Sequence, residues 1–198
     1  MPAPTFATSR AAWGARPPTT PFVRVSWRGR RTLWLHHTVG NRVAPAEPGM
    51  PGPRWLRVLT TPAKFPADLV RRVRMQKALA EAARARTVEA ECAAMRQIQA
   101  FHQKTRGWKD IGYGWVLFES GRLYEGRGFE VQAAHCPGHN DEPSVSLAGD
   151  YTSRPPTLLQ RRTFKQLQSA LGTPEAAGHR DGFPTACPGD AAYEALVA

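Results

Sequence analysis

Short apolar runs in this chain alternate with longer stretches in which apolar residues recur every three or four positions. Residues 33–35 form an apolar run that ends at two histidines, and they predict a short buried strand. Residues 111–119 predict another strand, which a Ser-Gly turn joins to residues 122–124. Strands joined by so short a turn predict a β-hairpin.

Apolar residues at helical spacing predict a helix in the middle of the chain, with Asp68 as its N-cap. The face that this helix would turn toward a core carries Val88, Cys92, Met95, Ile98 and His102. Because His102 belongs to this stripe, the pattern favours a core histidine over a metal ligand.

A last helix is predicted over residues 158–171, where Gly172 and Pro174 follow as a stop signal. Strands mixed with helices in this order predict an α/β fold, with a central mixed β-sheet flanked by helices. A chain of 198 residues with 41% hydrophobic content can bury one core, so residues 1–198 are expected to form a single domain.

The connection between the first strand and the helical stripe differs from the rest in composition. Residues 45–66 carry eight prolines or glycines and predict a loop. Residues 69–91 are rich in Ala and Arg, and they predict a solvated helix, with a binding or lid role as the alternative.

The chain has 27 Lys and Arg against 16 Asp and Glu, which gives a formal net charge of +11. Such a charge indicates attraction to a polyanion, or it simply keeps the protein soluble. The sequence shows no recognisable nucleic-acid-binding motif, so we expect no nucleic-acid partner. No apolar run is long enough to span a membrane. The N-terminus lacks the pattern of a secretory signal, so we expect accumulation in the cytoplasm.

Candidate metal ligands lie in two parts of the chain. His179 and Cys187 belong to a Pro/Gly-rich segment that could turn an imidazole and a thiolate toward one point, and His36 and His37 end the first strand. A catalytic zinc keeps three protein ligands and leaves a fourth position to water or substrate, which a His/His/Cys set would satisfy. Neighbouring side chains of a strand point to opposite faces, so His36 and His37 cannot easily bind the same ion.

A rival metal cluster is formed in the sequence by His135, Cys136 and His139, although the Pro-Gly turn between them would have to fold their side chains inward. The three cysteines do not make an even disulfide framework, and we expect them to be reduced. Cys92, in the helical stripe, is expected to be a small buried hydrophobe.

Five sequence blocks carry a resemblance to a known family. They are Ser9-Arg-Ala-Ala-Trp-Gly-Ala-Arg-Pro-Pro18, Leu35-His-His-Thr38, Ile98-Gln-Ala-Phe-His102, Gly107-Trp-Lys-Asp-Ile-Gly-Tyr113 with Leu123-Tyr-Glu-Gly-Arg-Gly128, and Gly178-His-Arg-Asp181 with Cys187-Pro-Gly-Asp190. In this order they resemble the zinc-dependent N-acetylmuramoyl-L-alanine amidases of the peptidoglycan-recognition-protein and phage-lysozyme superfamily. The blocks cover nearly the whole chain, apart from a loop and helix insertion at about residues 43–91.

The resemblance implies a Zn²⁺ ion bound by His36, His179 and Cys187. It implies catalytic roles for Tyr113, whose phenol could hydrogen-bond the attacking water or the oxyanion, and for Thr185, whose uncharged hydroxyl is the weaker candidate. Without the resemblance, Tyr113 would be read as a half-buried strand residue. Substrate contacts are implied for His135, Asn140 and Arg127. Where some relatives place an acidic catalytic residue, this chain has Ala148, which disfavours a mechanism that needs a carboxylate there.

The implied fold is that of the peptidoglycan-recognition proteins, and the implied reaction is hydrolysis of the amide between N-acetylmuramic acid and L-alanine in bacterial peptidoglycan. The absence of a secretory signal favours a phage endolysin catalytic domain, monomeric, that causes host lysis after release from the cytoplasm. Two alternatives stay open. One is a peptidoglycan-binding module without catalysis, and the other is a zinc peptidase that cuts within the stem peptide.

Overall fold

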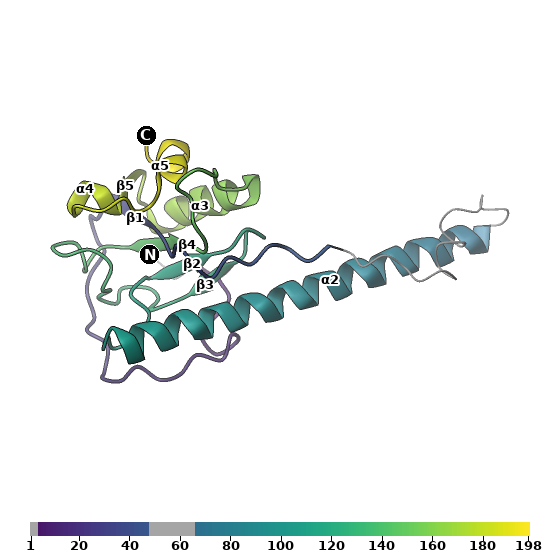
Figure 1. The fold of residues 1–198 in the computed structure, drawn as a ribbon, viewed down its shortest axis with the longest axis horizontal. Coiled ribbons are helices and arrows are strands. Elements are labelled where there is room, and N and C mark those ends of the chain that lie inside the picture. Colours follow the sequence, from purple (N-terminus) through teal and green to yellow (C-terminus); the bar gives the residue numbers. More distant parts are fainter. Residues whose placement is uncertain (1–3, 48–65) are drawn as a thin grey trace. The chain divides into compact units, whose positions relative to one another are not determined.

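The computed structural model describes residues 4–47 and 66–198, and it contains a mixed sheet with strand order β3-β2-β4-β1-β5 (Figure 1). The strands are β1 (Thr32–His37), β2 (Trp115–Leu117), β3 (Leu123–Glu125), β4 (Ser144–Leu147) and β5 (Glu175–Gly178). Strand β1 runs parallel to β4 and to β5, β2 runs parallel to β4, and β3 pairs antiparallel with β2. The predicted α/β fold with a mixed sheet and flanking helices is confirmed.

The hairpin is also confirmed, since Leu117 of β2 pairs with Leu123 of β3 across the predicted turn. The strand predicted at residues 111–119 is shorter than expected, because only 115–117 pair in the sheet. Residues 111–114 form a tight loop instead. A Cβ at Gly114 would lie 2.9 Å from the carbonyl oxygen of Ser144, and one at Gly126 would lie 2.4 Å from that of Tyr113.

The main core lies between one face of the sheet and helix α3 (Leu158–Leu171). Leu33 and Leu35 of β1 point to this face and pack in one cluster with Phe164, Leu167 and other buried side chains. Helix α3 has the predicted bounds. It starts with a capping box between Thr157 and Gln160, and it ends at Gly172, whose φ of 64° is left-handed and therefore suits glycine.

The second layer is the C-terminal part of helix α2 (Pro66–Ala100), which continues into the π-helical turn η1 (Phe101–Thr105). Cys92, Met95, Ile98 and His102 are buried as the helical stripe predicted, whereas Val88 is half-buried. Three side chains of the hairpin region donate hydrogen bonds to the buried carboxylate of Glu91. They are Ser120 Oγ at 2.5 Å, Arg122 Nε at 2.6 Å and Tyr124 Oη at 2.9 Å.

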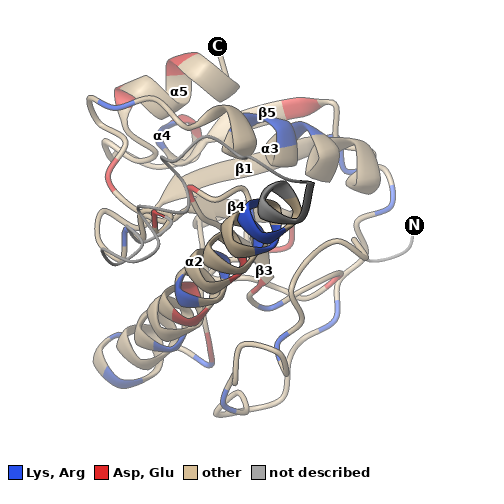
Figure 2. Ribbon diagram, turned by 90° about the vertical axis from the view of Figure 1, so that its right-hand side faces the viewer, with Lys and Arg blue, Asp and Glu red and all other residues tan. Residues whose placement is uncertain are grey.

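The chain divides into two compact units, one of residues 1–43 and 91–198 and the other of residues 44–90. In the second unit, α2 begins at Pro66, so Asp68 lies inside the helix, and the prediction of Asp68 as the N-cap was wrong. Thr87 Oγ1 accepts a hydrogen bond of 2.8 Å from the Ala46 amide. Figure 2 shows that Lys and Arg residues recur along α2. Residues 48–65 of the predicted loop lie outside the described part of the chain.

The short helices α4 (His179–Gly182) and α5 (Asp190–Leu196) complete the fold after β5. In the described ranges, 4–47 and 66–198, no helix combines the length and the apolar character that crossing a membrane requires.

Candidate metal centre and its cavity

Strand β1 turns its two terminal histidines to opposite sides of the sheet, as the strand period requires. His36 is buried, and its ring centroid lies 4.6 Å from that of His179. On the other side, His37 Nδ1 accepts a hydrogen bond of 3.3 Å from the Tyr151 amide and lies 3.8 Å from a carboxylate oxygen of Asp150. The prediction that the two side chains point to opposite faces is confirmed.

His36, His179 and Cys187 come together at the carboxyl ends of the central strands. One ligand atom from each lies within 4.8 Å of the others, and Cys187 Sγ is 3.8 Å from His36 Nδ1. Zinc bonds of about 2.0–2.3 Å at tetrahedral angles place ligand atoms roughly 3.3–3.7 Å apart. The cluster therefore needs only a small contraction to hold a zinc ion.

The backbone around Cys187 holds its sulfur toward this point. His37 donates its amide N–H to Cys187 Sγ at 3.4 Å, and Thr185 Oγ1 accepts the Cys187 amide at 3.2 Å. The Cys187 carbonyl accepts the Arg180 amide at 3.0 Å, which ties the loop to α4. His179 starts α4 directly after β5, so the strand and the loop present the two ligands side by side.

The electrostatics of the two histidines fit a metal, whereas the thiol of Cys187 would release its proton on binding one. Burial holds the pKa of His36 well below its ordinary value, with further lowering from His135 and His179, so the ring is neutral at neutral pH and keeps the lone pair of one nitrogen for a metal. Burial raises the pKa of the Cys187 thiol to about 11 in the metal-free chain. His179 Nε2 is buried without a hydrogen-bond partner among the described residues. An orphaned buried nitrogen is what a metal ligand looks like without its ion.

A chain of hydrogen bonds fixes the ring of His36. His135 Nε2 lies 3.3 Å from the carbonyl oxygen of Glu142, which can only accept, so this nitrogen carries the proton. His135 Nδ1 is then an acceptor, and it lies 3.0 Å from His36 Nε2. His36 therefore donates from Nε2 and keeps the lone pair of Nδ1 for the metal. Burial lowers the pKa of His135 to about 3, which keeps its ring neutral.

Tyr113 lies beside the cluster, in the loop before β2. Its ring centroid is 5.3 Å from that of His36 and 5.6 Å from that of His102. Burial, and after it the nearby Cys187, raises the pKa of Tyr113 to about 12, so its hydroxyl remains a donor at neutral pH. Its place at the site, and not in a strand, departs from the interpretation of Tyr113 as a sheet residue.

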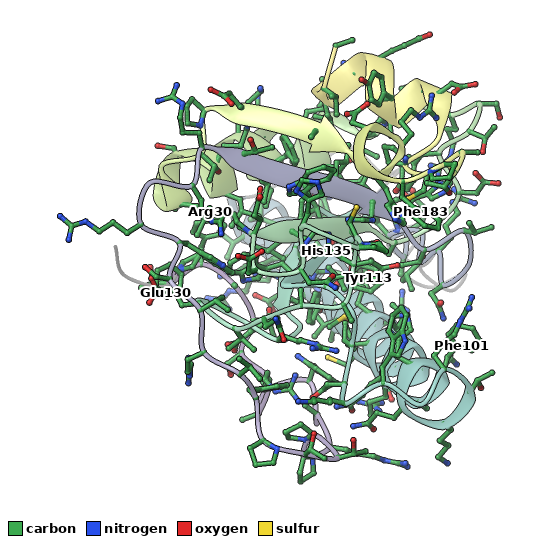
Figure 3. The ribbon with its side chains drawn as sticks, turned by 90° about the vertical axis from the view of Figure 1, so that its left-hand side faces the viewer. Arg30, Phe101, Tyr113, Glu130, His135 and Phe183 are labelled. Atoms are coloured by element: carbon green, nitrogen blue, oxygen red, sulfur yellow. The ribbon has the colours of Figure 1, made fainter. Side chains whose placement is uncertain are left out.

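The cluster opens into a cavity of about 600 Å³. In Figure 3, Tyr113 and His135 lie between Phe183 and Phe101. The described residues that line the cavity are His36, Thr38, Asn41, Ile98, Phe101, His102, Arg106, Trp108, Tyr113, Ala134, His135, Cys136, Pro137, Asn140, His179 and Phe183. None of these is acidic, in accord with the apolar Ala148 noted in the sequence.

The remaining residues singled out from the sequence have different places. His135 and Asn140 line the cavity, and Asn140 Oδ1 also accepts the amides of His135 at 2.8 Å and Cys136 at 3.0 Å. Thr185 lies near the ligand loop but is not in the cavity lining. Arg127 is buried, and it donates to the carbonyls of Ile111 at 2.6 Å and Gln132 at 2.8 Å. These two hydrogen bonds support the loop that carries Tyr113.

The rival cluster does not assemble in the described part of the chain. His135 pairs with His36, while His139 Nδ1 lies 3.3 Å from a carboxylate oxygen of Glu142. Cys136 lines the cavity and is a free thiol, like the other two cysteines.

Several cavity residues had no separate signal in the sequence, among them Thr38, Phe101, Arg106, Trp108 and Phe183. His102 was expected to be a core histidine, and it is buried. It also lines the cavity, where its Nδ1 accepts the Gly112 amide at 3.2 Å. Phe101 directly precedes His102, and Phe183 lies between the two motifs that carry His179 and Cys187. An aromatic residue so close to a candidate site residue is the sequence signal that could have identified both phenylalanines.

Comparison with known proteins gives a consistent family of relatives. No family model matches the sequence. The human protein N-acetylmuramoyl-L-alanine amidase is 42% identical over 115 residues, which are 53% of this chain and 20% of the human protein. Peptidoglycan-recognition protein LB of Drosophila melanogaster is 38% identical over 104 residues, which are 48% of this chain and 44% of that protein. The chain thus spans less than half the length of these two relatives.

Solved structures share the fold over almost the whole chain. A mutant of Drosophila PGRP-LB in complex with tracheal cytotoxin has a TM-score of 0.68 at 24% identity, with 95% of this chain and 90% of that chain covered. Peptidoglycan recognition protein LE, in complex with tracheal cytotoxin as a monomeric diaminopimelic acid-type peptidoglycan, has a TM-score of 0.66 at 20% identity, with 96% and 91% covered. The fold is that of the peptidoglycan-recognition proteins.

Proposed function

Since this chain is related in sequence to the N-acetylmuramoyl-L-alanine amidases and peptidoglycan-recognition proteins and has their fold, we propose that it is a zinc-dependent N-acetylmuramoyl-L-alanine amidase. Its substrate is bacterial peptidoglycan, in which it hydrolyses the amide between N-acetylmuramic acid and L-alanine. The observation that carries the proposal is the His36, His179 and Cys187 cluster at the wall of a cavity of about 600 Å³.

The chemistry follows from the stability of the amide. A zinc ion, when bound, polarises the amide carbonyl and lowers the pKa of a bound water toward about 7. One thiolate and two neutral imidazoles leave a net charge of about +1 on such a site, which favours a developing oxyanion.

The residues of the chain supply orientation and hydrogen bonding. His135 holds His36 with its Nδ1 lone pair toward Cys187. Tyr113 keeps its proton at neutral pH and donates it as a hydrogen bond to the attacking water or to the tetrahedral oxyanion. Because no carboxylate lines the described cavity, Tyr113 and a bound zinc would together carry more of the proton handling than they would beside an acidic residue. Thr185 orders the ligand loop through the Cys187 amide.

End-group analysis of digested wall tests this proposal. Purified peptidoglycan is treated with the zinc-loaded protein, with the metal-stripped protein as the control. New L-alanine amino termini are expected with zinc alone. Internal peptide termini would show a zinc peptidase, and tight wall binding without new termini would show a binding module. Either result would replace the amidase assignment.

A wall amidase of this kind suits lysis of a bacterial host, with accumulation in the cytoplasm and action on the wall after release, as in a phage endolysin. We include this role, a monomeric state and a single catalytic domain in the proposal. Turbidity of a bacterial culture that expresses the chain, before and after permeabilisation of its inner membrane, tests the role. We expect the turbidity to drop only after permeabilisation. Unchanged turbidity after permeabilisation would contradict the lytic role.

A further inference from the structure

Phe183 is an exposed aromatic side chain at the mouth of the cavity. It is 44% exposed, and its ring stacks on that of His179 with centroids 5.7 Å apart and an interplanar angle of 23°. One face of the ring is thus occupied by a metal-ligand candidate, which leaves its remaining surface open. Exposure of a large apolar side chain to water is unfavourable, and a bound substrate that covers the ring would remove this cost.

The backbone before Phe183 is packed in a way that fixes this position. A Cβ at Gly182 would lie 2.9 Å from both Cys136 Sγ and the Trp34 ring, so only glycine lets the turn approach so closely. The Phe183 amide donates to the His179 carbonyl at 3.0 Å. Because both ends of the turn are held, the ring is pre-organised before a ligand arrives.

The charged side chains of α4, the helix that precedes Phe183, form hydrogen bonds and an ion pair with other parts of the chain. Arg180 donates to Asp190 at 2.7 Å and to the Ala186 carbonyl at 2.6 Å. Asp181 accepts the Gly178 amide at 2.7 Å and the Tyr193 hydroxyl at 2.9 Å. Both charged side chains of α4 are therefore engaged away from the cavity.

The rim of the cavity at Phe101 carries a positive charge. Phe101 is 47% exposed and also lines the cavity, but the Arg106 guanidinium lies over its ring, 5.5 Å from the centroid. Figure 3 shows the two phenylalanines on either side of Tyr113. A muramoyl peptide has a neutral sugar on one side of its scissile amide and a peptide with carboxylates on the other. The cationic rim attracts the peptide side, which leaves the uncharged rim at Phe183 for the sugar.

We propose that Phe183 is a sugar-binding residue, whose ring stacks on the pyranose of the muramoyl group next to the scissile amide. This assignment rests on the proposed amidase function. The ring face carries the negative part of the aromatic quadrupole and attracts the C–H groups on one face of a pyranose. Stacking on His179 keeps the ring close to the metal, where the sugar joined to the scissile carbonyl must lie.

Binding to metal-free protein tests the assignment without turnover. Dissociation constants are measured by isothermal titration calorimetry for a muramoyl peptide and for the lactoyl peptide that lacks the sugar ring but keeps the amide. Phe183→Leu retains apolar volume without the ring and is expected to weaken muramoyl-peptide binding about 3- to 10-fold. Its affinity for the lactoyl peptide, and that of Phe183→Tyr for both ligands, should stay within a factor of about two of the parent.

Leu158→Ala is the matched control, since Leu158 is 74% exposed on α3 and outside the cavity lining. If Phe183→Leu weakened the binding of both ligands equally, the ring would contact the peptide and the proposal would be overturned. An unchanged affinity for both ligands would also overturn it. If the zinc-loaded protein hydrolyses nothing but Phe183→Leu still loses the sugar preference, the amidase function fails while this assignment stands. Absence of any muramoyl-peptide binding and hydrolysis overturns both.

Discussion

His36 Nε2 lies 3.0 Å from His135 Nδ1, although 99 positions separate the two residues in the chain. With the Glu142 carbonyl beyond it, His135 sets the tautomer of His36 and the direction of its free lone pair. A residue that the family resemblance assigns to substrate contact thus also orients a candidate metal ligand.

The first prediction concerns this orientation. His135→Ala removes the acceptor of the His36 N–H and is expected to weaken zinc binding about 10- to 100-fold, as the loss of partners behind a metal ligand commonly does. His135→Asn, whose side-chain oxygen can replace Nδ1, should lose less. Zinc dissociation constants from competition with a chromophoric chelator measure both. Equal affinity of the parent and His135→Ala would show that His135 serves the substrate alone.

The second prediction concerns the ligands. Ala substitution of His36, His179 or Cys187 is expected to abolish both tight zinc binding and amide hydrolysis, because two ligands neither hold nor orient the ion. Cys136→Ala is the control and should retain zinc, which mass spectrometry of metal content can show. Loss of zinc in Cys136→Ala together with its retention in Cys187→Ala would revive the rival cluster.

The third prediction concerns Tyr113. Tyr113→Phe should leave zinc bound and lower kcat roughly 10²-fold or more, since loss of one oxyanion donor typically costs about 2.7–4 kcal/mol. The ring is retained, so its contacts with His36 and His102 should persist. An unchanged kcat with a lower Tm would mean that Tyr113 serves only the packing of its loop.

The fourth prediction is a pH dependence of stability in the metal-free protein. Burial lowers the pKa of His102 from 6.5 to about 4, so the folded state favours the neutral ring. Its contribution is present above pH 6.5 and is lost as the pH falls toward 4, because the unfolded chain takes up the proton first. Between pH 7 and pH 4.5 this single group accounts for about 2 kcal/mol. Urea titrations should show that His102→Gln, which cannot titrate, loses about that much less than the parent.

The fifth prediction concerns the net charge of +11. If this charge brings the enzyme to an anionic wall, activity on intact wall should fall steeply as salt shortens the Debye length from ~30 Å at 0.01 M to ~8 Å at 0.15 M. Activity on a small soluble muramoyl peptide should change much less. Charge reversal at Arg74, which is exposed on α2 near Arg71 and Arg72, should weaken the salt effect. Equal salt dependence on both substrates would leave the charge as a solubility feature.

The sequence predicted a structural feature correctly where the residues of a single helix or strand determine that feature. The bounds of α3 followed from Thr157 and Gly172, because capping and a left-handed C-terminal residue act within one turn. The separation of His36 from His37 followed from the period of a strand. The start of α2 and the extent of β2 were missed by a few residues. Propensity does not show that the backbone at Gly112 and Gly114 packs closely against Ala134 and Ser144.

The sequence by itself determined the type of most elements, the alternation along β1, and, through its motifs, the three residues that can hold a metal. The element types and the alternation depend on backbone geometry over a few positions, whereas the metal set came from the resemblance of the motifs to a known family. Only the tertiary structure decided that His135 faces His36, that Arg127 supports a loop, and that Phe101 and Phe183 form two rims of one cavity. These relations join residues from different elements, and their distances exist only after the sheet order brings β1, β4 and β5 side by side.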